Sequence, residues 1–150
     1  TYVMAKKFNF RFETVLKLRA EKVTQAQESL NQVVKVRIEK EKTIEDYKNY
    51  KLHINNTVLK TTKASDLQNS IHHKQYIESE ILRLEKEKLQ IIEIEKLRRN
   101  KLTVAMKDEK VMEKLKDKKI NQHNEDIRLE ESKFFDEVGI NQTQRLNKEQ

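Results

Sequence analysis

The chain has 150 residues and a net charge of +7, and its charged residues (38%) outnumber its hydrophobic residues (35%). So small an apolar share cannot enclose a thick globular core, and a chain without proline and with one glycine favours long helices that share a narrow apolar seam. The lack of cysteine excludes disulfides and thiolate zinc sites.

The first half of the chain carries the clearest pattern, a series of apolar residues spaced alternately by three and four. This spacing predicts a helix over about residues 10–59 that packs against one partner helix. Asn9 is a candidate N-cap for it, or residues 8–12 run extended before it. The two columns of the seam are Leu16, Val23, Leu30, Ile44 and Val58, and Phe12, Ala26, Val33, Tyr47 and Ile54.

Four cations interrupt this seam: Arg19, Arg37, Lys40 and Lys51. A long cation in a seam position can bury its stem and send its charge to solvent, which weakens the local contact. One interpretation is register control, or a slight shift of the seam onto Val36 and Ile38. The other is a coiled coil kept loose because it must bind or flex.

The polar stretch over about residues 60–70 predicts the turn after the first helix. A second helix is expected over about residues 71–138, although a capping box from Ser65 to Gln68 leaves an earlier start open. Its apolar residues fit no single heptad frame, which suggests a stutter around residues 97–102. Gly139 is expected to end it in a left-handed conformation, followed by a flexible tail over residues 139–150.

Two long helices joined by one turn should fold back on each other. We therefore predict an all-α fold, a long two-helix antiparallel coiled-coil hairpin that forms a single domain over residues 1–150. Residues 1–22 hold six Lys or Arg against two acids, and residues 96–119 hold ten against four. The hairpin should bring these stretches into the same half, as a cationic end. Met4 is a candidate for the natural first residue, a point that the sequence leaves open.

Catalytic and ligand-binding motifs are missing. One glycine cannot build a phosphate-binding loop, and the four histidines are too scattered for a metal site, so we expect neither enzyme activity nor a cofactor or metal. Nucleic acid is disfavoured because acids alternate with the cations and aromatic residues accompany them only over residues 8–12. No apolar run approaches the roughly 18 residues of a membrane-spanning helix, so a soluble, intracellular protein is expected.

Two groups of residues stand out as sequence motifs. The first is Phe8-x-Phe10-Arg11-Phe12-x-Thr14-Val15-Leu16-x-Leu18-Arg19, followed by Gln25-Ala26-Gln27 and Leu30. The second is Arg98 or Arg99, Leu102, Ala105, Lys110-Val111-x-Glu113-Lys114-Leu115-Lys116 and Asp136-Glu137. In this order, and with this length, charge and helical plan, the chain resembles the FliJ family of flagellar type III export proteins over nearly its whole length.

The resemblance implies a non-enzymatic, cytoplasmic subunit, peripheral at the cytoplasmic face of the inner membrane. Members look like the central stalk of a rotary ATPase: they engage the export ATPase ring, promote its assembly and link it to the export gate, a membrane protein. Export chaperones are further implied partners. The stalk proteins of virulence-type secretion systems are an alternative within the same mechanism.

Two sets of contact residues follow from the resemblance combined with the charge pattern. The ATPase-contact candidates are Phe8, Phe10, Arg11, Phe12, Lys17, Arg19, Arg98, Arg99 and Lys101. The export-gate candidates are Tyr47, Tyr50 and Tyr76, of which Tyr47 could instead simply fill its seam position. A generic coiled-coil scaffold, which would form a concentration-dependent dimer, and a helical-hairpin chaperone, which would bind unfolded clients, remain alternative functions.

Overall fold

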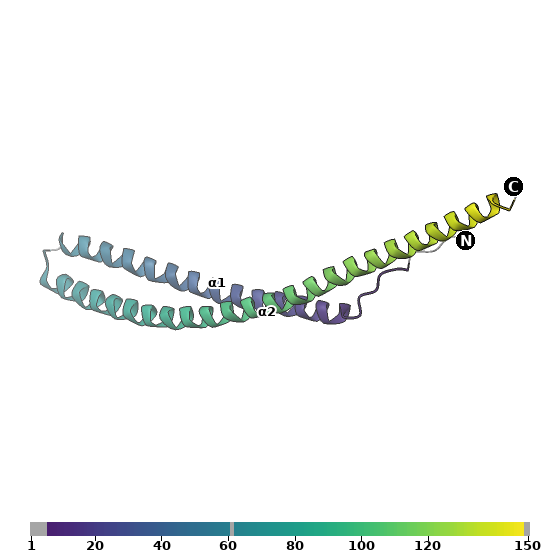
Figure 1. Cartoon of the computed structure of the whole chain (residues 1–150). Helices are drawn as coiled ribbons and strands as arrows, with labels where there is room; N and C mark the ends of the chain where they lie inside the picture. The colour runs from purple at the N-terminus through teal and green to yellow at the C-terminus, as the bar shows by residue number, and fades with distance from the viewer. Residues whose placement is uncertain (1–5, 61, 149–150) are drawn as a thin grey trace. The chain divides into compact units, whose positions relative to one another are not determined.

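The computed structural model describes residues 6–60 and 62–148, and Met4 lies outside them. Two helices account for most of these residues: α1 spans Glu13–Val58 and α2 spans Ala64–Leu146 (Figure 1). The helices pack against each other as an antiparallel hairpin, which confirms the predicted all-α fold, and the described residues contain no strand. Neither helix includes a described stretch that is long and apolar enough to cross a membrane.

Contacts divide the chain into two compact units, where the sequence predicted a single domain. We call Thr1–Glu21 with Met106–Gln150 the terminal unit and Lys22–Ala105 the hairpin unit. Each unit contains a segment of α1 packed on a segment of α2. The buried apolar residues of the hairpin unit are Leu30, Val33, Ile44, Ile54, Ile77, Leu84 and Leu102, and those of the terminal unit are Phe10 and Met112.

The helix α1 follows the predicted seam. Residues at the alternating three- and four-residue spacing are buried or half-buried from Leu16 to Val58, while most of the residues between them are exposed. Val36 and Ile38 are 47% and 53% exposed, so the proposed shift of the seam onto them is wrong. The helix begins at Glu13 rather than near residue 10, because Phe10 turns inward and its carbonyl accepts the Glu13 N–H at 3.1 Å.

The helix α2 begins at Ala64, seven residues before the predicted start. The Lys63 carbonyl accepts the Leu67 N–H at 3.1 Å, and Asp66 lies in the first turn. A carboxylate is favoured there because the first backbone N–H groups of a helix lack partners within it. The predicted turn over residues 60–70 is therefore too long, because its residues 64–69 form the exposed first turns of α2.

No stutter occurs around residues 97–102. Buried and half-buried residues continue at the same spacing from Ser70 to Lys116. The interpretation failed because Glu95, which is 8% exposed, and the half-buried Arg98 occupy seam positions, whereas Ile94 and Leu97 point outward. Apolar side chains alone therefore traced the wrong face of this segment.

The predicted helix stop at Gly139 is also wrong. The helix runs to Leu146, and Gly139 lacks the positive φ that a left-handed cap requires, so the predicted tail does not begin at residue 139. Every described residue from Arg128 onward is exposed. Glycine at such an exposed position can remain helical at a modest propensity cost.

Candidate functional site

The four seam cations of α1 each meet an oxygen on α2. In the hairpin unit, Arg37 Nε lies 2.6 Å from a Glu95 carboxylate oxygen. Lys40 and Lys51 pair with Glu87 and Glu78 at 2.7 and 2.9 Å. In the terminal unit, Arg19 Nη1 donates to the Asp108 carbonyl at 2.7 Å. This pairing fits the register-control interpretation, because a slip of one helix along the other would separate each cation from its acceptor.

The Arg37 pair is part of a small network. Glu95 also accepts from Arg99 at 2.9 Å, and Arg37 also binds Glu41 at 2.9 Å. The hydrogen bonds from Arg37, and secondly from Arg99, lower the pKa of Glu95. The bond to Glu95 in turn raises the pKa of Arg37. A charged carboxylate is thereby maintained at a buried seam position.

The terminal unit contains a segment without helix over residues 6–12, in which residues 11 and 12 form a turn. We call this segment the strap. Phe10 is buried (6% exposed) and anchors it to the helices. Phe8 packs on the His123 ring with centroids 5.5 Å apart, and His123 Nε2 donates to the Lys6 carbonyl at 2.7 Å. The strap is therefore held against α2 by one buried ring and one histidine.

The strap presents the first part of the predicted ATPase contact. Phe12 is 41% exposed, and the Arg11 guanidinium lies 5.7 Å from its ring centroid, a cation–π distance. Lys17 is exposed, whereas Arg19 is half-buried by its bond to α2. The available surface is thus Phe12 with Arg11 and Lys17, while Phe10 serves as an internal anchor.

The second part of that predicted contact belongs to the hairpin unit. Arg98 is half-buried and donates to the Ser29 carbonyl at 2.9 Å, so it supports the packing of α2 on α1. Arg99 and Lys101 are exposed, and Arg99 is tied to Glu95. The structure assigns these three residues to a different compact unit from the strap.

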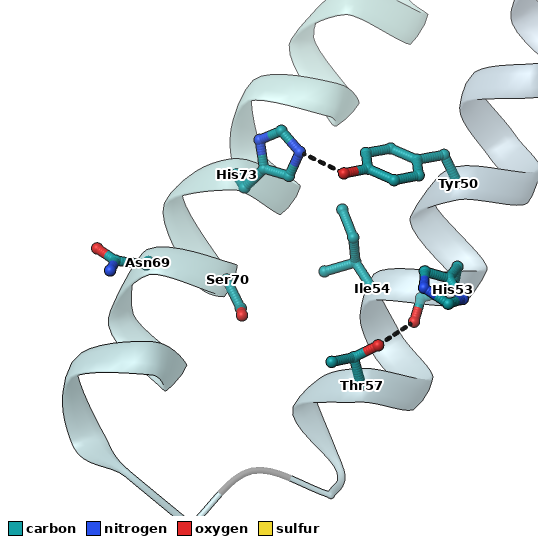
Figure 2. A pocket seen from close by; sticks show the side chains of 7 residues that line it. All are labelled: Tyr50, His53, Ile54, Thr57, Asn69, Ser70 and His73. Carbon is teal, nitrogen blue, oxygen red and sulfur yellow. Dashed lines mark hydrogen bonds between the residues drawn. The ribbon is translucent and has the colours of Figure 1, made fainter.

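Two of the three predicted gate residues, Tyr50 and Tyr76, form a cluster with His73 near the turn. Figure 2 shows Tyr50 and His73, whose hydroxyl and Nε2 are hydrogen-bonded at 3.0 Å. Tyr76 stacks on His73 with centroids 6.5 Å apart, and Tyr50 and Tyr76 are 45% and 56% exposed. A cavity of about 360 Å³ lies beside Tyr50 and His73, lined by Tyr50, His53, Ile54, Thr57, Asn69, Ser70 and His73.

Tyr47 does not belong to this exposed cluster. It is half-buried at its position in the seam of α1. Tyr47 therefore fills its seam position, as the alternative prediction for it stated.

Sequence reasoning considered the histidines only as metal ligands and missed the contacts that two of them make. His73 joins Tyr50 to Tyr76, and His123 joins the strap to α2. The contact between Tyr50 and His73 could have been predicted from an antiparallel pairing, because the two residues lie at similar distances in sequence from the turn. That prediction needs the exact position of the turn, and the predicted turn over residues 60–70 was too long to provide it.

A family model described as flagellar FliJ protein matches residues 8–148. The chain belongs to the FliJ family. The match confirms the resemblance carried by the two groups of motifs, and membership makes the chain a flagellar export-related protein. Searches of curated proteins and of solved structures found no match.

Proposed function

We propose that this FliJ family chain is a non-enzymatic, stalk-like subunit of the flagellar export apparatus. In this proposal it binds the export ATPase ring, promotes ring assembly and activity, and links the ring to the export gate. It acts in the cytoplasm, peripheral to the inner membrane through its partners, and export chaperones are further partners. The family match over residues 8–148 carries the proposal, and the hairpin fold supports it because paired helices are stiffer than a single helix.

The strap and the adjoining turn of α1 supply the ring contact in this proposal. Arg11 and Lys17 are exposed cations beside the exposed Phe12 ring, and neither forms an ion pair within the described residues. Exposed charges of this kind accelerate association and are screened over about 8 Å at physiological ionic strength. They also suit contact with several equivalent subunits, since exposed and screened charges bind no single subunit tightly.

Reversal of Arg11 and Lys17 to Glu is expected to remove most of the stimulation of the purified export ATPase. The helix content should remain that of the parent, because both side chains are exposed. Stimulation by the parent should also weaken as salt rises from dilute to physiological buffer. ATPase rate against chain concentration, with circular dichroism of each variant, provides the measurement.

The matched control is reversal of Lys42 and Lys86 in the hairpin unit, which are also exposed. It should leave stimulation nearly unchanged. Reversal of Arg99 and Lys101 measures whether their part of the predicted contact contributes; Arg98 is left intact because it supports packing. Equal stimulation by the Arg11/Lys17 and Lys42/Lys86 variants, or stimulation insensitive to salt, would refute the ring contact.

The cluster of Tyr50, His73 and Tyr76 supplies the gate contact in this proposal. The exposed Tyr50 ring lines a cavity, and the exposed Tyr76 ring stacks on the adjacent His73, so together they form a suitable anchor for an apolar segment of a partner. Replacement of both Tyr50 and Tyr76 by Ala should abolish binding to the purified cytoplasmic part of the gate protein. ATPase stimulation and helix content should persist. A loss of helix content would instead indicate that the rings serve packing, and unchanged gate binding would place the contact elsewhere.

A further inference from the structure

A second cavity, open to solvent, lies between the strap and α2 within the terminal unit and measures about 600 Å³. One wall is the strap itself, and the other is a stretch of α2 between Lys119 and Asp126. The residues that line it are Lys6, Lys7, Phe8, Asn9, Phe10, Arg11, Phe12, Lys119, Gln122, His123 and Asp126.

The lining combines positive charge with aromatic surface. Lys6, Lys7, Arg11 and Lys119 face a single carboxylate, that of Asp126. None of these cations forms an ion pair with any residue that the structure describes. Four such cations around one cavity attract an anion, and the rings of Phe8 and Phe12 offer an apolar group a place beside it.

The backbone N–H groups of the strap favour a peptide over other anionic ligands. Between residues 6 and 60 and between 62 and 148, no hydrogen bond uses the N–H groups of residues 7–9. An extended peptide can pair with such a backbone while its side chains enter adjacent pockets. A phosphate ion or a lipid headgroup would use the cations but would leave the backbone and the rings without partners.

We propose that this cavity binds an acidic peptide segment in which carboxylates flank an aromatic or aliphatic side chain. The carboxylates meet Lys6, Lys7, Arg11 and Lys119, and the apolar side chain packs against the phenylalanine rings. The inference rests on the proposed function for the source of the segment, which is a subunit of the export ATPase ring. It adds Lys119 to the ring contact as a direct ligand of that segment.

His123 is a positioning residue for this cavity. Its bond to the Lys6 carbonyl and its contact with the Phe8 ring fix the N-terminal end of the strap on α2. Without them the strap would be anchored through Phe10 alone, so the wall that carries Lys6 and Lys7 would move away from Lys119. The cavity should then lose affinity although no ligand-binding charge has been removed.

The direct test uses the peptide Gly-Asp-Phe-Asp-Leu-Asp-Gly-amide, with fluorescein attached to its N-terminal amine, and fluorescence anisotropy with the full chain. Lys119→Glu should weaken binding about tenfold or more, because it places a like charge in the cavity. Lys114→Glu is the matched control on the same helix, exposed and outside the lining, and should change affinity by less than about twofold. A neutral peptide, in which Asn replaces each Asp, should bind the parent chain no more tightly than the acidic peptide binds Lys119→Glu.

Equal effects of Lys119→Glu and Lys114→Glu, or equal binding of the acidic and neutral peptides, would overturn the proposal. So would binding of phosphatidylglycerol vesicles or inorganic phosphate that depends on Lys119 when the acidic peptide does not bind. These outcomes would assign the cavity to a membrane surface or a free anion.

The role of His123 is tested with His123→Ala and His123→Gln. The alanine variant should weaken peptide binding and lower the heteronuclear NOE of residues 7–9, whereas glutamine, which retains a side-chain N–H, should restore part of both. Unchanged NOE values in His123→Ala would show that the strap does not depend on this residue.

Stimulation of the ATPase separates this inference from the function on which it rests. A chain that stimulates the ATPase but does not bind the acidic peptide retains the proposed function and refutes the cavity as its acidic-peptide site. In the other outcome, Lys119→Glu weakens peptide binding but leaves ATPase stimulation unchanged. That result would support the cavity as an acidic-peptide site and would exclude the ATPase ring as the source of the peptide.

Discussion

Arg37 and Glu95 show how single residues define this coiled coil. Both occupy seam positions that an apolar pattern would assign to leucine or valine, and both remain charged because each satisfies the other. Removing one partner would leave the other charge uncompensated in the interface. The loss of folding free energy would then exceed the net stabilisation that the pair provides. Such pairs therefore select the register more than they add to stability.

The pKa of Glu95 predicts a pH dependence of stability. Arg37, and secondly Arg99, hold that pKa below its ordinary value of 4.5, so the folded state binds fewer protons than the unfolded state as pH falls through this region. The stabilisation is complete above about pH 4.5 and is lost as pH falls through the lowered folded-state pKa. The melting temperature of Glu95→Gln should therefore lie below that of the parent at neutral pH, and the gap should shrink at acidic pH.

Glu39→Gln is the matched control for this measurement. Glu39 is exposed on α1 and forms no ion pair within the described part of the chain, so its variant should follow the parent at each pH. Thermal unfolding by circular dichroism between neutral pH and about pH 3 provides the comparison. A gap between Glu95→Gln and the parent that stays constant over this range would contradict the ion-pair origin.

At the scale of elements, α2 is unusual because its ends and its middle have different environments. Between Ser70 and Ile127 it presents a seam to α1 or to the strap, whereas from Arg128 to Leu146 it is helical without a packed face. Most of the stability of a protein helix comes from packing. The last five turns of α2 should therefore respond most directly to intrinsic helix propensity.

Gly139→Ala should raise the helix content of the last turns of α2. The position has helical φ, and a Cβ atom added there would meet no other atom within 4 Å. The exchange should favour the local helix by about 1 kcal/mol, since alanine has the higher propensity. Carbon chemical shifts of residues 135–145 measure this, with Ser132→Ala as a control of smaller gain. A fall in local helix content would restore Gly139 as a left-handed helix stop.

At the scale of the whole molecule, the hairpin is held by pairs that bring distant parts of the chain together. In the terminal unit, Lys116 binds Glu13 at 2.9 Å and His123 contacts the strap. In the hairpin unit, Lys48 binds Glu85 at 3.0 Å and Lys51 binds Glu78. All are contacts within one chain, so no second copy is needed to form the coiled coil.

Spin labels test this intrachain pairing within each unit. Exposed positions Asn9 and Glu125 in the terminal unit, and Asn49 and Gln75 in the hairpin unit, should give distances within about 3 nm. The first pair is close because His123 holds the strap on α2, and the second because packed helix axes lie about 10 Å apart. Dilution of each labelled chain with excess unlabelled chain should leave the distances unchanged. Their loss on dilution would show pairing between chains and would favour the dimeric scaffold over the stalk.

The sequence alone determined the fold class, the seam of α1 and the family, because each rests on local periodicity or on the order of motifs. Heptad spacing specifies which face of a helix is buried, and a chain with two such helices and one turn has few ways to bury both faces. The start of α2, its seam around Glu95 and Arg98 and its continuation through Gly139 depended on tertiary structure. A polar or flexible residue takes its role from what lies opposite: Glu95 is a seam residue only because Arg37 faces it, and His123 fastens the strap only because the Lys6 carbonyl is within reach.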